Sequence, residues 1–214
     1  MWMIFLVSNP LTLRLFWKIT IMKQLISILL LFIASSAIAQ TEPTGLKVGD
    51  KAPMFIGTDQ NGQQFSLQEA LKKGNVVLMF YRGQWCPYCN KQMSQMNDSL
   101  SSITDKGARV IAVSPEVQDN VKKTIEKTKA SFPVISDVKM QIMKDYKVNF
   151  SVPQATQDRY KNFGIDFSIA NGENGANLPV PATYVIGTDG TIKYVFFNPD
   201  YRKRASVKEI AAYL

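Results

Sequence analysis

The apolar run at residues 75–81, NVVLMFY, limits the fold more than any other stretch of this chain. It is continuous instead of alternating, which is typical of a strand that is covered on both faces. Strand-like runs at 108–114 and 132–136 follow it, and each is succeeded by a helix-like segment. Because strands that alternate with helices build largely parallel sheets with helices on both faces, we predict an α/β fold.

Shorter signals extend this pattern toward both ends. The Asn-Gly pair at 61–62 predicts a hairpin, and the spacing of Ser66 and Glu69 predicts a capping box for a short helix. The sequence Ser-Pro-Glu at 114–116 predicts the start of a longer helix. Two strands are expected around the Asp-Gly pair at 189–190.

The first 39 residues differ in composition from the rest and are not expected to join the fold. They contain no acidic residue, and from Met22 onward a lysine, an apolar run and a small-residue end at Ala39 match a cleaved secretory signal. We therefore predict an exported, periplasmic protein with one domain at 40–214. An uncleaved membrane anchor is the alternative, and whether residues 1–21 are translated stays open.

Charge and composition exclude several kinds of site. The chain has no histidine, so imidazole bases and the usual zinc or copper ligand sets are absent. The net charge is +8, and it is spread along the sequence. The densest basic run, 202–204, has no interleaved aromatic platform, so it indicates a solvated turn and no nucleic-acid partner.

Cys86 and Cys89 are the only cysteines, and they follow the run at 75–81 directly. A structural disulfide would close a loop so short that it stabilises the fold by only roughly 2 kcal/mol. A thiol that opens a helix instead faces unpaired N–H groups, which favour the thiolate, and Pro87 suits the first helical turn. The second thiol can displace a mixed disulfide, so the pair can cycle if an external thiol reductant resets it.

A non-catalytic alternative is a peptide-binding or Cu(I)-binding module, since a C-x-x-C pair binds soft metals. With no histidine and no third cysteine, such a metal site would lack ligands. We therefore predict no metal and no cofactor.

Three segments together resemble a known family: GLKVGDKAPMFIGTDQNGQQFSL (45–67), VVLMFYRGQWCPYCN (76–90) and LPVPATYVIGTDGTIKYVFFNPDYRKR (178–204). They are similar to the peroxiredoxin-like branch of the alkyl hydroperoxide reductase and thiol-specific antioxidant family, and the resemblance covers nearly all of 45–214. It implies a thioredoxin-like fold, with a central mixed sheet, helices on both faces and an N-terminal β-hairpin extension.

The resemblance leaves the attacking cysteine open. Peroxiredoxin spacing assigns the attack to Cys89 and puts Cys86 at the position of a threonine and Arg82 at that of a proline. The thioredoxin order of tryptophan, cysteine, two residues and cysteine assigns it to Cys86. Arg82 is a candidate to help stabilise a bound peroxide or thiolate, and Trp85 and Tyr88 are expected to shield the thiols.

Peroxiredoxins also carry an arginine just before the strand that reads ATYVIG here, whereas this chain has Pro181. Thioredoxins have a cis-proline at that place, so the resemblance implies a cis Val180–Pro181 bond beside the cysteines. Thr183, inside the strand, is also expected to support the site, together with Pro181. The segment at 147–180 precedes Pro181 and is expected to lie near the cysteines with at least one helix, packed through Tyr160, Phe163 and Phe167.

The reading favoured by the resemblance is an exported antioxidant enzyme that reduces hydrogen peroxide or organic hydroperoxides through a Cys86/Cys89 cycle. Its reductant would be a thioredoxin-like protein or a membrane dithiol donor. The alternative is a thioredoxin-like oxidoreductase that acts on protein disulfides.

Overall fold

The computed structural model describes residues 17–24 and 42–214. Residues 17–24 form a helical segment whose side chains are exposed. Within the described residues, no helix combines the length and the apolar character needed to cross a bilayer. The apolar run and the cleavage position of the predicted signal peptide lie mainly at 25–41, outside the described residues.

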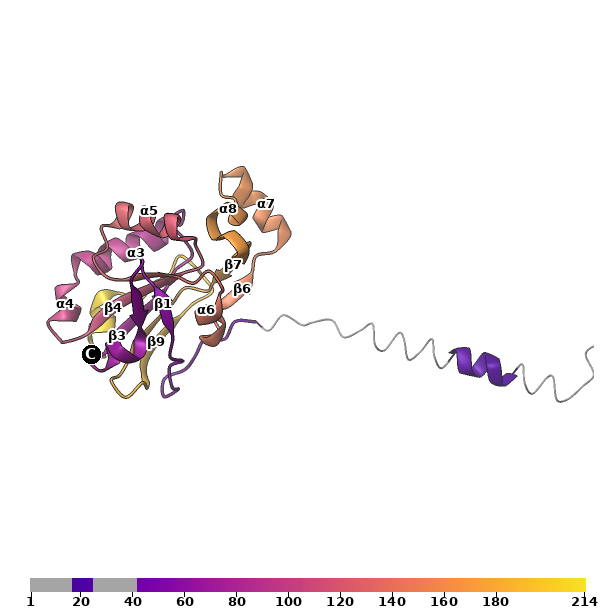
Figure 1. The fold of residues 1–214 in the computed structure, drawn as a ribbon, viewed down its shortest axis with the longest axis horizontal. Coiled ribbons are helices and arrows are strands. Elements are labelled where there is room, and N and C mark those ends of the chain that lie inside the picture. The colour runs from indigo at the N-terminus through magenta and orange to yellow at the C-terminus, as the bar shows by residue number, and fades with distance from the viewer. Residues whose placement is uncertain (1–16, 25–41) are drawn as a thin grey trace, which may run out of the picture. The chain divides into compact units, whose positions relative to one another are not determined.

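A five-stranded mixed sheet forms the centre of the domain (Figure 1). Its strand order is β5-β4-β3-β8-β9, with β3 parallel to β4 and β4 parallel to β5, while β8 pairs antiparallel with both β3 and β9. The strands are β3 (Val76–Phe80), β4 (Arg109–Ser114), β5 (Val134–Ser136), β8 (Ala182–Ile186) and β9 (Ile192–Phe197). The mixed sheet implied by the resemblance is confirmed, and the largely parallel sheet expected from alternation holds only for β3, β4 and β5.

Helices cover both faces of this sheet, as predicted. Residues of α2 and α6 share a buried cluster with alternate residues of β3, and residues of α3, α4, α5 and α9 share a cluster with the others. The continuous apolar run at 75–81 is therefore explained by burial on both faces. The helices are α2 (Leu67–Leu71), α3 (Pro87–Asp98), α4 (Ser101–Thr104), α5 (Gln118–Thr128), α6 (Gln141–Asp145), α7 (Gln154–Asn162), α8 (Phe167–Asn171) and α9 (Val207–Ala211).

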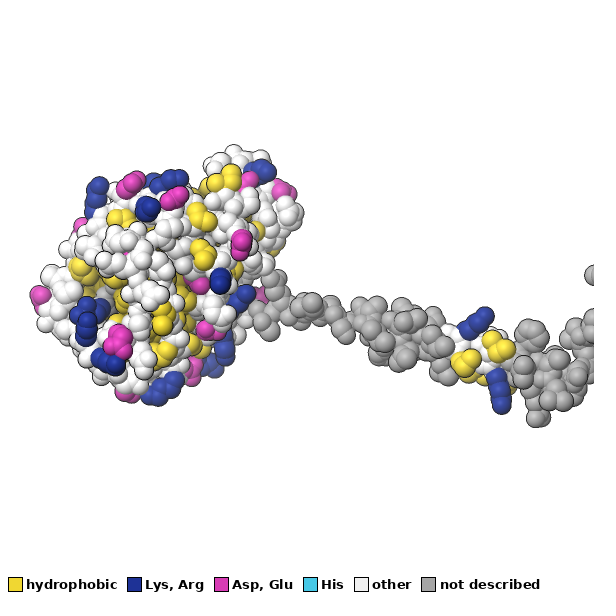
Figure 2. Space-filling view, in the orientation of Figure 1, with side chains coloured by type: hydrophobic (Ala, Val, Ile, Leu, Met, Phe, Trp, Pro, Cys, Tyr) yellow, Lys and Arg dark blue, Asp and Glu magenta, His cyan; other side chains and the backbone are white. Residues whose placement is uncertain are grey.

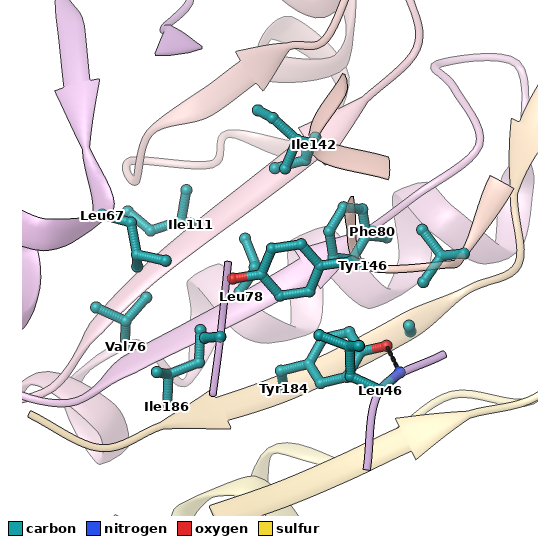
Figure 3. Close-up of a cluster of buried hydrophobic side chains, with 14 of the residues drawn as sticks. Leu46, Leu67, Val76, Leu78, Phe80, Ile111, Ile142, Tyr146, Tyr184 and Ile186 are labelled. Atoms are coloured by element: carbon teal, nitrogen blue, oxygen red, sulfur yellow. Dashed lines mark hydrogen bonds between the residues drawn. The ribbon is translucent and has the colours of Figure 1, made fainter. Parts of the chain in front are cut away.

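The cluster on the α2 and α6 face is built around aromatic side chains (Figure 3). The rings of Tyr146 and Tyr184 lie 5.4 Å apart, and Phe80 packs edge-on against Tyr184 at 6.0 Å. The Tyr184 hydroxyl accepts a hydrogen bond from the N–H of Leu46 at 3.2 Å. The Tyr146 hydroxyl donates to the carbonyl of Pro53 at 3.1 Å, so both buried phenols have partners.

Two of the shorter signals are confirmed. Strands β1 (Ile56–Thr58) and β2 (Gln64–Ser66) form the predicted antiparallel hairpin. The Ser66 side chain accepts a hydrogen bond from the N–H of Glu69 and so caps α2, as the capping-box spacing predicted.

The predicted start of the long helix at 114–116 was wrong, because α5 begins at Gln118. Tertiary hydrogen bonds hold the preceding residues outside the helix. The carbonyl of Pro115 accepts from the side chain of Asn174 at 2.8 Å, and the carboxylate of Glu116 accepts from the N–H of Gln84 at 2.9 Å. The first bond occupies a backbone carbonyl that an earlier helix start would use, and the second ties the Glu116 side chain to the segment before the cysteines.

The segment at 147–180 forms a small unit of its own to one side of the sheet (Figure 1). Its strands β6 (Asn149–Ser151) and β7 (Asn177–Pro179) pair antiparallel, and between them lie α7, α8 and the 3-10 helix η1 (Gly172–Asn174). Phe167 is buried and Tyr160 is half-buried, as expected. Phe163 is 82% exposed, so the prediction that it packs was wrong: it caps the end of α7 and faces solvent.

The predicted cis Val180–Pro181 bond was also wrong. Among the described residues no peptide bond is cis. The extended chain passes from β7 into β8 in the trans form: the Val180 N–H donates to the Val148 carbonyl at 2.7 Å, and the Pro181 carbonyl accepts from Asn198 at 3.3 Å. The trans form is the usual one for X-Pro bonds in folded proteins.

Charged side chains are dispersed over residues 42–214. On the face seen in Figure 2, basic and acidic side chains are interspersed instead of gathered by sign. This agrees with the spread of charge along the sequence.

Candidate active site

The register of the central sheet brings three segments to one edge. Phe80 pairs with Ala182, and Ala182 pairs with Phe197. The chain that leaves β3 after Phe80, the chain that enters β8 and the chain that leaves β9 therefore meet at this edge. The first of these segments carries the cysteines, the second carries Pro181, and the third continues to Arg204.

The cysteines lie at the N-terminus of α3, as the sequence predicted. Cys86 is the N-cap residue and Pro87 is the first residue of the helix. The Cys86 Sγ accepts a hydrogen bond from the N–H of Cys89 at 3.3 Å, so it takes the place of a capping oxygen. The two sulfurs are joined as a disulfide, with the Cα atoms 5.2 Å apart. This arrangement is the oxidised form of the predicted pair.

Both cysteines are buried, with Cys86 at 1% and Cys89 at 0% exposure. The expectation that the thiols are shielded fits this burial. In this conformation almost no surface of either cysteine is exposed to solvent. Exchange with another molecule therefore requires the side chains around the disulfide to move.

A group of five side chains, the arginine–aromatic cluster, lies at the disulfide. Ring and guanidinium contacts link its members, and the Arg204 Nη2 reaches the Cys89 Sγ at 3.4 Å. The members are Arg82, Trp85, Tyr88, Tyr201 and Arg204. Tyr88 and Tyr201 are 40% and 38% exposed, so they form the solvent side of the cluster.

Arg82 is the centre of this cluster. It is 5% exposed, and its guanidinium carbon lies 4.9 Å from the ring centre of Trp85 and 4.2 Å from that of Tyr201. Its Nη2 donates to the hydroxyl of Tyr160, which belongs to α7. Arg82 is therefore not the solvated side chain that a strand end would usually carry. Three aromatic rings and a hydroxyl hold it.

Trp85 joins the cysteines to the segment at 147–180. Its ring contacts Tyr160 at 5.3 Å and Phe167 at 5.5 Å between centroids, and it also packs against the cluster that contains both cysteines. The prediction that this segment lies near the cysteines is confirmed through these contacts.

Arg204 was missed by the sequence reasoning, which interpreted 202–204 as a solvated turn. Arg202 fits that interpretation, since it is exposed and pairs with Asp200 at 2.8 Å. Arg204 is half-buried, and burial together with the nearby charge of Arg82 lowers the pKa of its guanidinium to about 10. The register of β9 against β8, had it been drawn from the sequence, would have placed this segment at the cysteine edge.

Pro181 and Thr183 lie at the same edge but have different surroundings. The Pro181 carbonyl accepts from the backbone N–H of Asn198, which follows β9. Thr183 is buried within β8, and its hydroxyl accepts from the side chain of Gln92 on α3 at 3.5 Å. Thr183 thus connects the sheet to the helix that carries the cysteines.

Glu116 is a second residue that the sequence reasoning did not single out as functional. It is fully buried just after β4, and its carboxylate accepts from the N–H of Gln84, two residues before Cys86. Burial raises the pKa of this carboxyl from 4.5 to about 7. A Cβ on Gly83 would lie 2.5 Å from the Trp85 Nε1 and 2.7 Å from the Glu116 Oε1, so glycine is required there. The sequence signal that could have identified Glu116 is its position just after β4, the strand that lies parallel to β3.

Comparisons with known proteins agree with this geometry. The chain is 31% identical over 132 residues to the thiol-disulfide oxidoreductase ResA of Bacillus cereus, which covers 58% of this chain and 75% of the relative. It is 28% identical over 156 residues to ResA of Geobacillus kaustophilus, with 72% of each chain covered.

Solved structures share the fold. A peroxiredoxin-like protein from Aquifex aeolicus superposes with a TM-score of 0.59 at 21% identity, covering 80% of this chain and 87% of that one. The family model described as AhpC/TSA family matches residues 48–195, which is more than half of the 214 residues. The resemblance drawn from the three segments is thereby confirmed, and the chain belongs to the AhpC/TSA family.

Proposed function

We propose that this protein is a thiol–disulfide oxidoreductase that acts on disulfides and dithiols of other molecules, with Cys86 as the nucleophile and Cys89 as the resolving cysteine. The observation that carries the proposal is the position of Cys86 at the N-cap of α3, where its sulfur accepts the Cys89 N–H and is joined to Cys89. Backbone N–H groups at a helix start favour a thiolate over a thiol. This geometry matches the thioredoxin order of residues.

The reaction follows from thiol–disulfide exchange. In the reduced protein, the Cys86 thiolate attacks one sulfur of a substrate disulfide, so that a mixed disulfide forms and the first substrate sulfur leaves as a thiolate. The Cys89 thiolate then attacks the Cys86 sulfur, which closes the internal disulfide and releases the second substrate sulfur. Two electrons pass to the substrate, and its thiolates take protons from solvent. The disulfide in this structure corresponds to the end of that sequence.

Disulfide exchange is preferred to peroxide reduction for two reasons. The position of the peroxiredoxin arginine is occupied by Pro181. Arg82, the candidate to replace it, is held by three aromatic rings, those of Trp85, Tyr160 and Tyr201, and by the hydroxyl of Tyr160. The relatives reported above are named thiol-disulfide oxidoreductases, which supports the same choice. The peroxidase reading that the sequence favoured is therefore the second candidate.

The proposed place of this reaction rests on the N-terminal sequence, and the proposed partner rests on the chemistry of the disulfide. The composition of 1–39 favours export, with the domain at 40–214 released outside the cytoplasm. An oxidised Cys86–Cys89 pair then needs an external dithiol donor to start each new cycle.

The proposal is tested with purified protein in two parallel assays. One follows reduction of a protein disulfide, such as that of insulin, with dithiothreitol as the electron source, and the other follows loss of hydrogen peroxide with the same donor. We expect disulfide reduction to exceed the uncatalysed rate and to fall at least about 100-fold in Cys86→Ser, because that variant lacks the attacking sulfur. Cys89→Ser should retain a trapped mixed disulfide.

Two results would contradict the proposal. Peroxide loss that depends on Cys89 but not on Cys86, without disulfide reduction, would support the peroxiredoxin spacing. Alkylation of both reduced thiols at neutral pH no faster than a free cysteine would argue against either catalytic reading.

A further inference from the structure

The disulfide lies beside two positive side chains, Arg82 and Arg204, that form no ion pair among the described residues, 17–24 and 42–214. Asp200, the acid nearest to Arg204 in the sequence, is engaged by Arg202 through two hydrogen bonds at 2.8 and 3.1 Å and acts on Arg204 without forming an ion pair with it. The two guanidinium groups thus carry charges that no ion pair among the described residues neutralises.

The same side chains hold hydrogen-bond donors that are not used. The Nε atoms of Arg82 and Arg204 and the Nε1 of Trp85 are buried and lack an acceptor among the described residues. Buried donors without acceptors are costly, and in native structures they call for an explanation. Arg204 otherwise donates to the backbone carbonyls of Tyr201 and Lys203 and approaches Cys89 Sγ.

The surroundings favour an anion as the missing partner. The N-terminus of α3, a helix of 12 residues, has no acidic residue in its first turn and carries the positive end of the helix dipole. Guanidinium groups bind carboxylates through paired hydrogen bonds, and such charge-assisted bonds are strong. Tyr88 and Tyr201 are the exposed members of the cluster, so a ligand would approach from their side.

We propose that the arginine–aromatic cluster receives a carboxylate of the thiol or disulfide partner, so that the site selects partners with an acidic group close to the reacting sulfur. The proposal rests on the proposed function and adds the chemical class of the partner. A carboxylate that pairs with Arg204 would draw this side chain away from Cys89, and it would do so at the moment when the cluster has to open.

The step can be written for a small acidic dithiol. One thiolate of dihydrolipoate attacks a sulfur of the Cys86–Cys89 disulfide, forms a mixed disulfide and releases the other cysteine as a thiolate. The second thiolate of dihydrolipoate attacks the lipoyl sulfur of the mixed disulfide. This closes the cyclic disulfide of lipoate and releases the remaining cysteine as a thiolate. The protein gains two electrons, and the protons of the dithiol pass to solvent and to the cysteines.

The test compares two dithiols that differ at one group. Dihydrolipoate carries a carboxylate, whereas dihydrolipoamide carries a neutral amide in its place. The oxidised full-length domain is mixed with each, and the second-order rate of disulfide reduction is measured. We expect dihydrolipoate to react at least about fivefold faster, because the carboxylate gains charge-assisted hydrogen bonds. Raising the salt concentration to about 0.5 M should reduce this ratio in the wild-type protein.

Variants identify the residues responsible. Arg204→Met should bring the ratio close to one, while the matched variant Lys203→Met, which removes an equal charge from the exposed neighbouring side chain and leaves the Arg202–Asp200 pair in place, should keep it. Salt dependence in the unaltered protein decides the matter if Arg204→Met does not fold.

Two outcomes overturn the inference. Equal rates with both dithiols show that no carboxylate is received, although the disulfide is still reduced and the proposed function stands. A ratio that stays near one while Arg204→Met slows alkylation of Cys89 shows that the guanidinium stabilises the protein's own thiolate. If neither dithiol reduces the disulfide, the proposed function itself fails.

Discussion

The aromatic core on the α2 and α6 face and the arginine–aromatic cluster at the disulfide are both built on aromatic side chains, yet their buried polar atoms differ in whether they have hydrogen-bond partners. In the core, the Tyr184 hydroxyl accepts from the Leu46 N–H (Figure 3). The Tyr146 hydroxyl donates to the Pro53 carbonyl. In the cluster, donors of Arg82, Trp85 and Arg204 have none among the described residues.

Whether a buried polar group has a partner affects the stability of the fold. A buried polar group with a partner adds to the stability of the fold, whereas one without a partner lowers it. Proteins retain such costs mainly at functional sites, where a ligand or a reaction intermediate supplies the partner. The contrast agrees with the site proposed at the disulfide. It can be tested by variants on either side.

The largest expected effect on stability comes from Glu116, the buried acid that is hydrogen-bonded to the segment just before Cys86. Its pKa is raised to about 7 in the folded state, so between about pH 4.5 and 7 the folded protein holds a proton that the unfolded chain has lost. Stability should therefore fall as pH rises through this window, by about 3 kcal/mol from this group. Denaturant unfolding at several pH values should show this slope reduced in Glu116→Gln.

The exposed Glu126 of α5 provides the control for that experiment. Glu126→Gln should leave the pH dependence as it is in the wild type. If the pH dependence of the unfolding free energy is unchanged in Glu116→Gln, the folded protein tolerates an ionised carboxylate at this position. The cysteine end of the sheet would then differ less from the aromatic core.

An intermediate effect is expected for Tyr184→Phe in the aromatic core. The variant removes the acceptor of the buried Leu46 N–H, which should lower the free energy of unfolding by about 1–3 kcal/mol. The matched variant Tyr88→Phe, in the exposed part of the cluster, should change it by less than about 0.5 kcal/mol. Chemical denaturation measures both. Equal losses would remove the distinction between the two regions.

The smallest effect, and one of opposite sign, is expected for Arg204→Met. Removing a half-buried cation that has no acidic partner should leave stability unchanged or raise it by about 0.5–1 kcal/mol, as substitutions at functional sites often do. The midpoint of denaturant unfolding of the oxidised protein gives the answer. A loss above about 2 kcal/mol would make Arg204 a structural residue.

The sequence predicted most elements because their local signals and their tertiary roles agree. The hairpin at 61–62, the cap at Ser66 and the placement of Cys86 at a helix start were confirmed. The errors occurred where long-range contacts decide. The α5 start was displaced by bonds from Gln84 and Asn174, and Phe163 was left in solvent although its neighbours in the segment pack.

The sequence by itself determined the chemistry that is possible: without histidine and with one C-x-x-C pair, the reactive groups are thiols, and an apolar strand followed by Pro87 sets one of them at a helix start. Only the tertiary structure decided what surrounds the sulfurs. Arg204 and Glu116 are 115 and 27 residues from Cys89 in the sequence, and the register of β9 and the parallel pairing of β4 bring them to the same edge. Strand pairing acts at a distance along the chain, so local patterns do not reveal it.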